Sequence, residues 1–342
     1  MRKRCTAQLN HIVWCSHRSG MTNCGSEYGR YVMKDLLRKI KRALAGVLRL
    51  VIVQSPLPLD GQSWAIKSLL PMDPWPKSLA YQQCLANRVL RSHGPVTQNG
   101  PFKGMICIRD AEEGCLVPKL LGCYEEELVP AVEGFIQRGF DRFIDVGCAS
   151  GYWLAGVALR MPRAEVFGFD IDRDALARCS ELLALNKVQS RVRLLGLCTP
   201  VELERLIAGR TLLFMDCDGP EYELLDPHLA PALRRADIIV ECHDHINPRI
   251  SSTLQGRFKE THLIQSISSR TREPSTERYP GLRALPRAHW AEALNERRPC
   301  VQKWLIMRSR KLASHEQAIN SGAEILSELL HSSSLVRVPH DE

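Results

Sequence analysis

The segment 143–172 constrains the fold of this chain more than any other stretch. It reads FIDVGCASGYWLAGVALRMPRAEVFGFDID, an apolar strand, a glycine-bearing turn, a helix, a second apolar strand and an acidic end. In doubly wound sheets the first strand leads into the ligand-binding turn, and a carboxylate at the tip of the second strand holds ribose hydroxyls. Asp170 stands at that tip, nineteen positions after Gly151. The order predicts a Rossmann-like sheet with a nucleoside-bearing ligand.

A second acid indicates which ligand this is. Asp145 stands two residues before Gly147. A dinucleotide would bring a doubly negative pyrophosphate to the turn, and a buried carboxylate would repel it. S-adenosylmethionine has no phosphate and presents an ammonium and a sulfonium, which a carboxylate attracts. A dinucleotide G-x-G-x-x-G pattern would also need glycines where Ala149 and Tyr152 stand. We therefore expect S-adenosylmethionine.

The pattern around this segment predicts an α/β fold with a doubly wound, mostly parallel seven-stranded sheet. Apolar segments that favour strands alternate with segments of helical periodicity, and right-handed crossovers make such a series parallel. Two late strands without a helix between them predict an antiparallel edge hairpin. The expected strands are 142–146, 165–169, 192–197, 211–215, 237–241, 261–266 and 301–308. Before the sheet we expect a hairpin of short strands within 104–117 and a helix over 124–137, and a further helix is expected over 221–233.

The remaining sequence is divided by composition. The net charge of +8 comes from the first 60 residues, which hold eleven Lys or Arg against three acids, so an attraction to polyanions would belong to this arm and not to the sheet. We expect an N-terminal extension before the sheet domain. The predicted parts are a disordered leader at 1–30, a basic amphipathic helix at 31–53, a linker and accessory segment at 54–114, the sheet domain at 115–310, and a C-terminal helix with a polar tail at 311–342.

The segment 31–53 places apolar residues at helical spacing opposite a run of Lys and Arg. Such a helix packs on its own protein or lies on an anionic membrane surface as a peripheral contact. The thirteen cysteines are scattered without a C-x-x-C pair, which favours buried thiols in a reducing cytoplasm over a disulfide framework or zinc module. The sequence contains no apolar run long enough for a transmembrane helix. The oligomeric state is not readable from it.

The chain resembles a class I S-adenosylmethionine-dependent methyltransferase, and more narrowly the FkbM-like group. The resemblance covers roughly residues 115–310 and rests on four motifs. They are DVGCASG at 145–151, GFDID at 168–172, MDCDGPE at 215–221 and VECH at 240–243. The FkbM-like pattern after the fourth strand is commonly D-x-E-G-x-E, whereas Asp218 stands where that Glu falls and Pro220 precedes Glu221. The resemblance implies O-methylation of a hydroxyl on a small molecule or sugar.

The predicted catalytic residues follow the fourth and fifth strands. Asp216 and Asp218 follow one strand, Glu241 and His243 the next, and parallel strand ends face one crevice. His243 is the expected general base because an unperturbed imidazole titrates near neutrality, with Glu241 or Asp218 orienting it. His245 is a rival for the same role. These groups could also hold a divalent metal, but we favour no metal because such carboxylates often only organise loops or the donor.

The predicted cofactor contacts lie in the turn and at the strand ends. Gly147, Ala149 and Gly151 let the backbone approach the methionine portion, and Asp145 attracts its ammonium. Asp170 holds the ribose, and Asp216 completes the set.

Two alternatives stay open. One is a methyltransferase acting on nucleic acid or protein; nucleic acid is the weaker choice, because no Asn/Asp-Pro-Pro-aromatic run follows the fourth strand. The other is a non-catalytic scaffold protein that keeps the fold and the S-adenosylmethionine site, with the basic arm as its working part.

Overall fold

The computed structural model describes residues 79–109 and 115–313. The predicted leader at 1–30, the basic helix at 31–53, part of the segment 54–114 and most of the tail 311–342 lie outside these residues, so those predictions stay open. All the described residues belong to one compact unit.

Seven strands form one sheet in the order β3-β2-β1-β4-β5-β7-β6. The five strands β1 to β5 pair in parallel, and β7 runs antiparallel to both β5 and β6. The strands are β1 Arg142–Val146, β2 Glu165–Phe169, β3 Val192–Leu195, β4 Thr211–Met215, β5 Asp237–Cys242, β6 His262–Ser268 and β7 Lys303–Ser309. This arrangement is typical of methyltransferases with a Rossmann-like fold and confirms the predicted fold class.

The helices cover both faces of the sheet. Strands β4 and β5 are buried at every position, as expected for the middle of a parallel sheet between two helical layers. The main helices are α3 Leu79–His93, α4 Leu116–Leu121, α5 Val129–Arg138, α6 Tyr152–Arg160, α7 Arg173–Leu185, α8 Pro200–Leu206, α9 Glu221–Leu224, α10 Ile250–Phe258 and α11 Trp290–Ala293. Short 3-10 turns are η1 Glu126–Leu128, η2 Gln189–Arg191, η3 Pro231–Arg235, η4 Pro280–Ala284 and η5 Arg287–His289.

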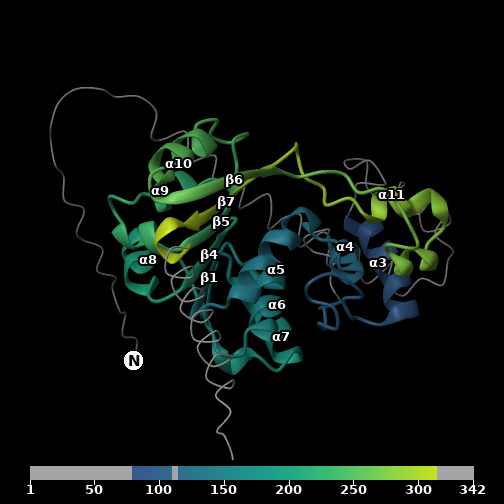
Figure 1. Cartoon of the computed structure of the whole chain (residues 1–342). Helices are drawn as coiled ribbons and strands as arrows, with labels where there is room; N and C mark the ends of the chain where they lie inside the picture. The colour runs from purple at the N-terminus through teal and green to yellow at the C-terminus, as the bar shows by residue number, and fades with distance from the viewer. Residues whose placement is uncertain (1–78, 110–114, 314–342) are drawn as a thin grey trace, which may run out of the picture. The chain divides into compact units, whose positions relative to one another are not determined.

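Each face of the sheet has its own apolar core. Helices α5, α6 and α7 lie on one side and α8, α9 and α10 on the other (Figure 1). Successive residues of a strand enter opposite cores, so Phe143 packs with the first group and Ile144 with the second. A third cluster joins α3, α4 and η4 through residues such as Leu85, Leu120 and Leu282.

Three local predictions differ from the structure. A hairpin of short strands was expected within 104–117, but Ile106 bridges to Val96 and Leu116 begins α4, whose end is capped by Gly122 in the left-handed conformation. One helix was expected over 221–233, but α9 ends at Leu224. Pro227 and Pro231 follow, and proline cannot continue an α-helix. A helix was also expected over 124–137, where the turn η1 precedes α5.

Within the described residues, no helix is both long and apolar enough to cross a bilayer.

Candidate active site

The turn after β1 packs directly against the loop after β4. Gly147 has a φ of +85°, and a Cβ there would lie 1.8 Å from the backbone oxygen of Asp216. The Gly147 and Cys148 amides both donate to the carbonyl of Phe169 at the end of β2, at 2.8 and 3.0 Å. The glycine therefore allows a close approach between two strand ends. A glycine is also required at position 151, since a Cβ there would lie 2.5 Å from the Cys179 sulfur.

Asp170 ties the tip of β2 to this turn. Its Oδ2 accepts a hydrogen bond from the Ala149 amide at 2.9 Å, and its Oδ1 accepts one from the Asp172 amide at 2.8 Å. Ala149 itself has a φ of +48°, an uncommon conformation for a residue with a side chain. A carboxylate oxygen can accept more than one hydrogen bond. Asp170 can thus shape the turn and still accept from a ligand hydroxyl.

Asp145 is a buried acid in β1 with only 2% of its surface exposed. Burial raises its pKa well above the ordinary value, and Asp216, Asp170 and Glu125 raise it further. Such a carboxyl group is costly to ionise unless a positive charge comes near it. The turn between β1 and α6 is therefore electrostatically suited to a cationic ligand.

His243 follows β5, and its ring is held by Glu221, an acid at the end of the loop after β4. Its Nδ1 lies 2.8 Å from Oε1 of Glu221, the first residue of α9. The same oxygen accepts the Cys217 amide at 3.1 Å. Because a carboxylate oxygen in this position can only accept, Nδ1 carries the hydrogen, and Nε2 is the ring nitrogen left to face the site.

Nε2 of His243 points at two carboxylates of the β4 loop. It lies 3.5 Å from Oδ1 of Asp216 and 3.4 Å from Oδ1 of Asp218. Burial acts to lower the pKa of His243, but the Glu221 hydrogen bond and the nearby acids outweigh burial and raise it above its ordinary value. His245 lies next to the ring, with 5.6 Å between the ring centroids.

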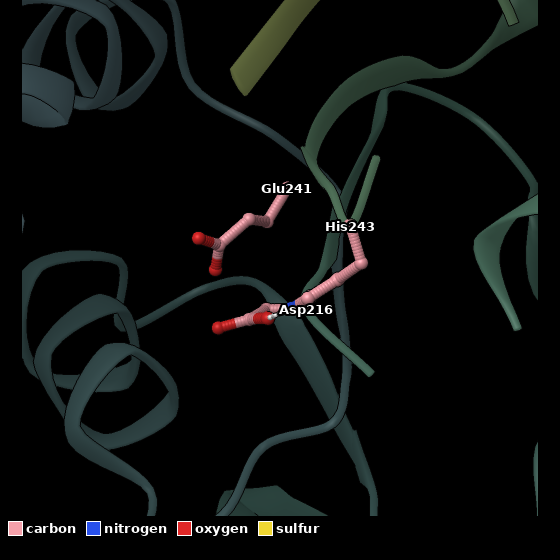
Figure 2. Close-up of side chains that lie close together, drawn as sticks. All are labelled: Asp216, Glu241 and His243. Carbon is pink, nitrogen blue, oxygen red and sulfur yellow. Dashed lines mark ion pairs between the residues drawn. The ribbon is translucent and has the colours of Figure 1, made fainter. Parts of the chain in front are cut away.

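Asp216 and Glu241, at the ends of β4 and β5, both have raised pKa values. Burial raises the pKa of Asp216 well above its usual range, and Glu241 adds to this. Burial also raises the pKa of Glu241 to about 7, although Arg298 opposes the shift. Figure 2 shows the Asp216 and Glu241 carboxylates directed to the same side, with His243 beside Asp216. Ligand atoms of these three residues all lie within 4.8 Å of one another, so they could hold a metal ion.

An arginine from the segment between β6 and β7 enters this acidic group. The Arg298 guanidinium forms an ion pair with Glu241 through Nη1, and its Nη2 lies 3.1 Å from Oε1 of Glu125. The second oxygen of Glu125 accepts the indole hydrogen of Trp153, a buried core residue of α6. Arg298 also pairs with Glu296 at 3.0 Å. The site is therefore joined to the segment between β6 and β7.

That segment also walls a pocket. Residues of 270–278 and of η1 form an open pocket of about 410 Å³, lined by Glu126, Glu127, Arg270, Thr271, Arg272, Glu273 and Arg278. The Arg272 side chain pairs with Glu296 at 2.7 Å and with Glu127 at 3.0 Å. Glu296 is the residue that also contacts Arg298, so an ion-pair chain runs from the pocket wall to Glu241.

The predicted site residues come together, and further residues join them. The residues predicted to bind the cofactor lie in and around the turn after β1; they are Asp145, Gly147, Ala149, Gly151, Asp170 and Asp216. The residues predicted to be catalytic stand at the ends of β4 and β5; they are Asp218, Glu241 and His243. Sequence reasoning did not find the roles of Glu221, Arg298 and Glu125. Glu221 opens the helix after β4 and could have been inferred as a partner of a residue after β5. Arg298 and Glu125 lie 57 and 116 positions from Glu241, and no spacing signals their contacts.

Comparisons with known proteins give local and distant likenesses. No family model matches the sequence. Over 107 residues the chain is 35% identical to a ribosomal protein L11 methyltransferase of Exiguobacterium sibiricum, a match that covers 29% of this chain and 32% of the relative. The matched region thus spans about a third of that relative's length.

Solved structures resemble it at low identity. The O-methyltransferase TomG from Streptomyces achromogenes, solved with SAM, has a TM-score of 0.36 at 12% identity, with 72% of this chain and 95% of that chain covered. The cofactor-bound Rv0187 from MTB has a TM-score of 0.35 at 17% identity, with 75% and 99% covered.

Proposed function

We propose that this chain is an S-adenosylmethionine-dependent methyltransferase. The observation that carries the proposal is the group of buried acids around the turn after β1, with Asp145 2% exposed and its pKa raised well above the ordinary value. Ligands of doubly wound sheets bind at the carboxyl ends of the strands, where this group lies. A cationic sulfonium and ammonium would relieve the repulsion among these acids, whereas a pyrophosphate would increase it. The local identity to a ribosomal protein L11 methyltransferase supports the same activity.

The donor contacts follow from the strand ends. The turn of Gly147, Ala149 and Gly151 lies against the methionine portion, with Asp145 and Asp216 as counter-charges to its ammonium. Asp170 accepts hydrogen bonds from the ribose hydroxyls. Because Asp170 also holds the Ala149 amide at 2.9 Å, ribose binding and the shape of the turn depend on one side chain.

Methyl transfer then needs an acceptor oxygen in line with the sulfonium. The carbon–sulfur bond breaks with its electron pair left on sulfur, the oxygen–carbon bond forms, and the hydroxyl proton leaves the acceptor. An alcohol becomes sufficiently nucleophilic when a base takes this proton or a cation stabilises the alkoxide. Proton removal or stabilisation of the alkoxide can take place at the strand ends, where His243, Asp218 and Glu241 stand. Glu221 holds the imidazole with Nε2 facing the site.

The acceptor we propose is a hydroxyl of a small molecule or sugar. The FkbM-like resemblance of the segments 215–221 and 240–243 supports it. Protein is the second candidate acceptor, favoured by the name of the matched relative. Nucleic acid is the weaker one, because the excess positive charge lies in the first 60 residues, whereas basic and acidic residues balance in the rest of the chain.

Compartment and partners are part of the proposal. The cysteines in the described part of the chain are all free, and most are buried, which supports a reducing cytoplasm. The basic segment 31–53 is proposed as a peripheral membrane contact or an internal packing helix.

Transfer of a labelled methyl group tests the proposal. The full chain is incubated with S-[methyl-¹⁴C]adenosylmethionine and a metabolite extract, and the labelled products are separated and identified. We expect a labelled small molecule, and this product should be lost in Asp170→Ala. It should be kept in the control Asp174→Ala, since Asp174 is an exposed acid of α7. Label found only in protein would move the acceptor to the second candidate. If S-adenosylmethionine neither bound nor donated its methyl group, the proposed function would be wrong.

A further inference from the structure

The end of β5 presents a buried histidine nitrogen whose partners are two carboxylates at long range. His243 is 3% exposed, and Nδ1 of its ring forms a hydrogen bond with Glu221. Nε2 faces Asp216 and Asp218 at 3.5 and 3.4 Å, beyond the usual range of an N–H···O bond. A buried imidazole nitrogen directed at carboxylate oxygens across such gaps indicates that a positive group belongs between them.

The spacing of these atoms distinguishes a metal ion from an organic cation. An ammonium nitrogen lies about 2.9 Å from each hydrogen-bond partner, so two of its partners lie about 4.7 Å apart. A small divalent ion binds oxygen or nitrogen at about 2.1 Å, which places neighbouring ligand atoms about 3.0–3.4 Å apart. The 3.5 Å between His243 Nε2 and Asp216 Oδ1 is close to the second spacing and well short of the first. The Glu241 carboxylate completes a set of ligand atoms within 4.8 Å of one another (Figure 2).

The surroundings of these ligands are those of a metal site. Histidines that bind metals usually donate their other ring hydrogen to a carboxylate, which fixes the ring and its tautomer. Glu221 provides this contact and is itself fully buried. Arg298 holds the Glu241 carboxylate through an ion pair. The three ligands therefore stand on two strand ends with their supporting contacts already in place.

We propose that Asp216, Glu241 and His243 bind a divalent cation of the Mn²⁺ type. Two carboxylates with one imidazole form a mixed oxygen and nitrogen set, which suits Mn²⁺ better than the all-oxygen set preferred by Ca²⁺ or the thiolate sets of structural Zn²⁺. Resting on the proposed function, the ion holds the acceptor oxygen and stabilises its alkoxide. The hydroxyl proton then passes to Asp218, whose side chain is 73% exposed, and from there to water.

Binding of Mn²⁺ alone tests the site without any turnover. Chelator-treated full chain is titrated with MnCl₂, and the free aqueous Mn²⁺ signal is followed by electron paramagnetic resonance. We expect one tight site, with affinity reduced at least tenfold in Asp216→Asn and in His243→Gln. The matched controls are Asp226→Asn, an acid paired with Arg257 at 3.1 Å, and His228→Gln, an exposed histidine after α9; both should bind as the wild type does.

Two outcomes would overturn the proposal. One is that Mn²⁺ at millimolar concentration loses none of its free signal when it is mixed with a chain that still melts cooperatively. The other is Mn²⁺ binding that is unchanged in both Asp216→Asn and His243→Gln. Calorimetry with S-adenosylmethionine on the same samples separates the two proposals. Donor binding without Mn²⁺ binding removes the metal site alone, whereas absence of donor binding removes the proposed function.

Discussion

The Arg298 guanidinium forms an ion pair with the Glu241 carboxylate at the end of β5. The two residues are 57 positions apart, and Glu241 has only 4% of its side chain exposed. Arg298 comes from the segment between β6 and β7, outside the regular elements. Its second contact, to Glu125 at 3.1 Å, joins the segment that precedes α5 to the same centre. One arginine thus compensates two buried acids and connects the site with the surrounding segments.

Loss of Arg298 should destabilise the fold. Arg298→Met leaves Glu241 and Glu125 buried without their cation, and removal of one partner from a buried pair costs about 3 kcal/mol or more. The free energy of unfolding, measured by urea denaturation, should fall by about that amount. Arg283→Met, on the exposed surface of η4, should change it by less than about 0.5 kcal/mol. Equal stability of the two variants would show that Arg298 is dispensable for compensating these acids.

The turn after β1 should tolerate no side chain at its first glycine. A Cβ on Gly147 would lie 1.8 Å from the Asp216 oxygen, and the backbone φ of +85° is itself unfavourable for alanine. Gly147→Ala should therefore cost about 3 kcal/mol or more, measured by chemical denaturation. Gly196→Ala is the matched control, because nothing lies within 4 Å of a Cβ there. A Gly147→Ala variant as stable as the control would contradict the close packing of the two strand ends.

Stability should decline on the acid side of neutrality because of His262. Burial lowers the pKa of this histidine, whose Nε2 lies 2.8 Å from the Ala236 carbonyl. Since the folded pKa is below the unfolded value, the neutral ring stabilises the fold above about pH 6.5. This stabilisation is lost as the pH falls below that value toward the folded pKa.

The check is urea denaturation at a series of pH values from 7.5 to 5. His262→Gln should make the decline shallower, by up to about 1.4 kcal/mol per pH unit for one proton. His228→Gln, at an exposed histidine, should leave the wild-type slope. An unchanged slope in His262→Gln would mean that other groups cause the acid sensitivity.

The sheet could be predicted from the sequence because its signals are local. Strands β1, β2 and β4 have the predicted bounds, since each is a short apolar run between a turn and a periodic helix. The late antiparallel pair was also predicted, with ends that differ by one or two residues. The helix expected over 221–233 failed because Pro227 and Pro231 outweigh the apolar pattern around them.

The site could be predicted only as far as topology determines it. Parallel strands bring their carboxyl ends to one edge, which is enough to place Asp216 near His243. The partner that orients His243 was expected to be Glu241 or Asp218, but the hydrogen bond of Nδ1 is accepted by Glu221, and Glu241 instead pairs with Arg298. Side-chain contacts between segments distant in sequence depend on packing, and no periodicity encodes them.

Calorimetric titration of the full chain with S-adenosylmethionine, and separately with NAD, tests the central claim most directly. The claim is that acids around the β1 turn select a cationic ligand over a phosphate-bearing one. We predict micromolar binding of S-adenosylmethionine, no detectable binding of NAD at millimolar concentration, and at least tenfold weaker S-adenosylmethionine binding in Asp145→Asn. Binding of NAD, or S-adenosylmethionine affinity unchanged in Asp145→Asn, would contradict the account.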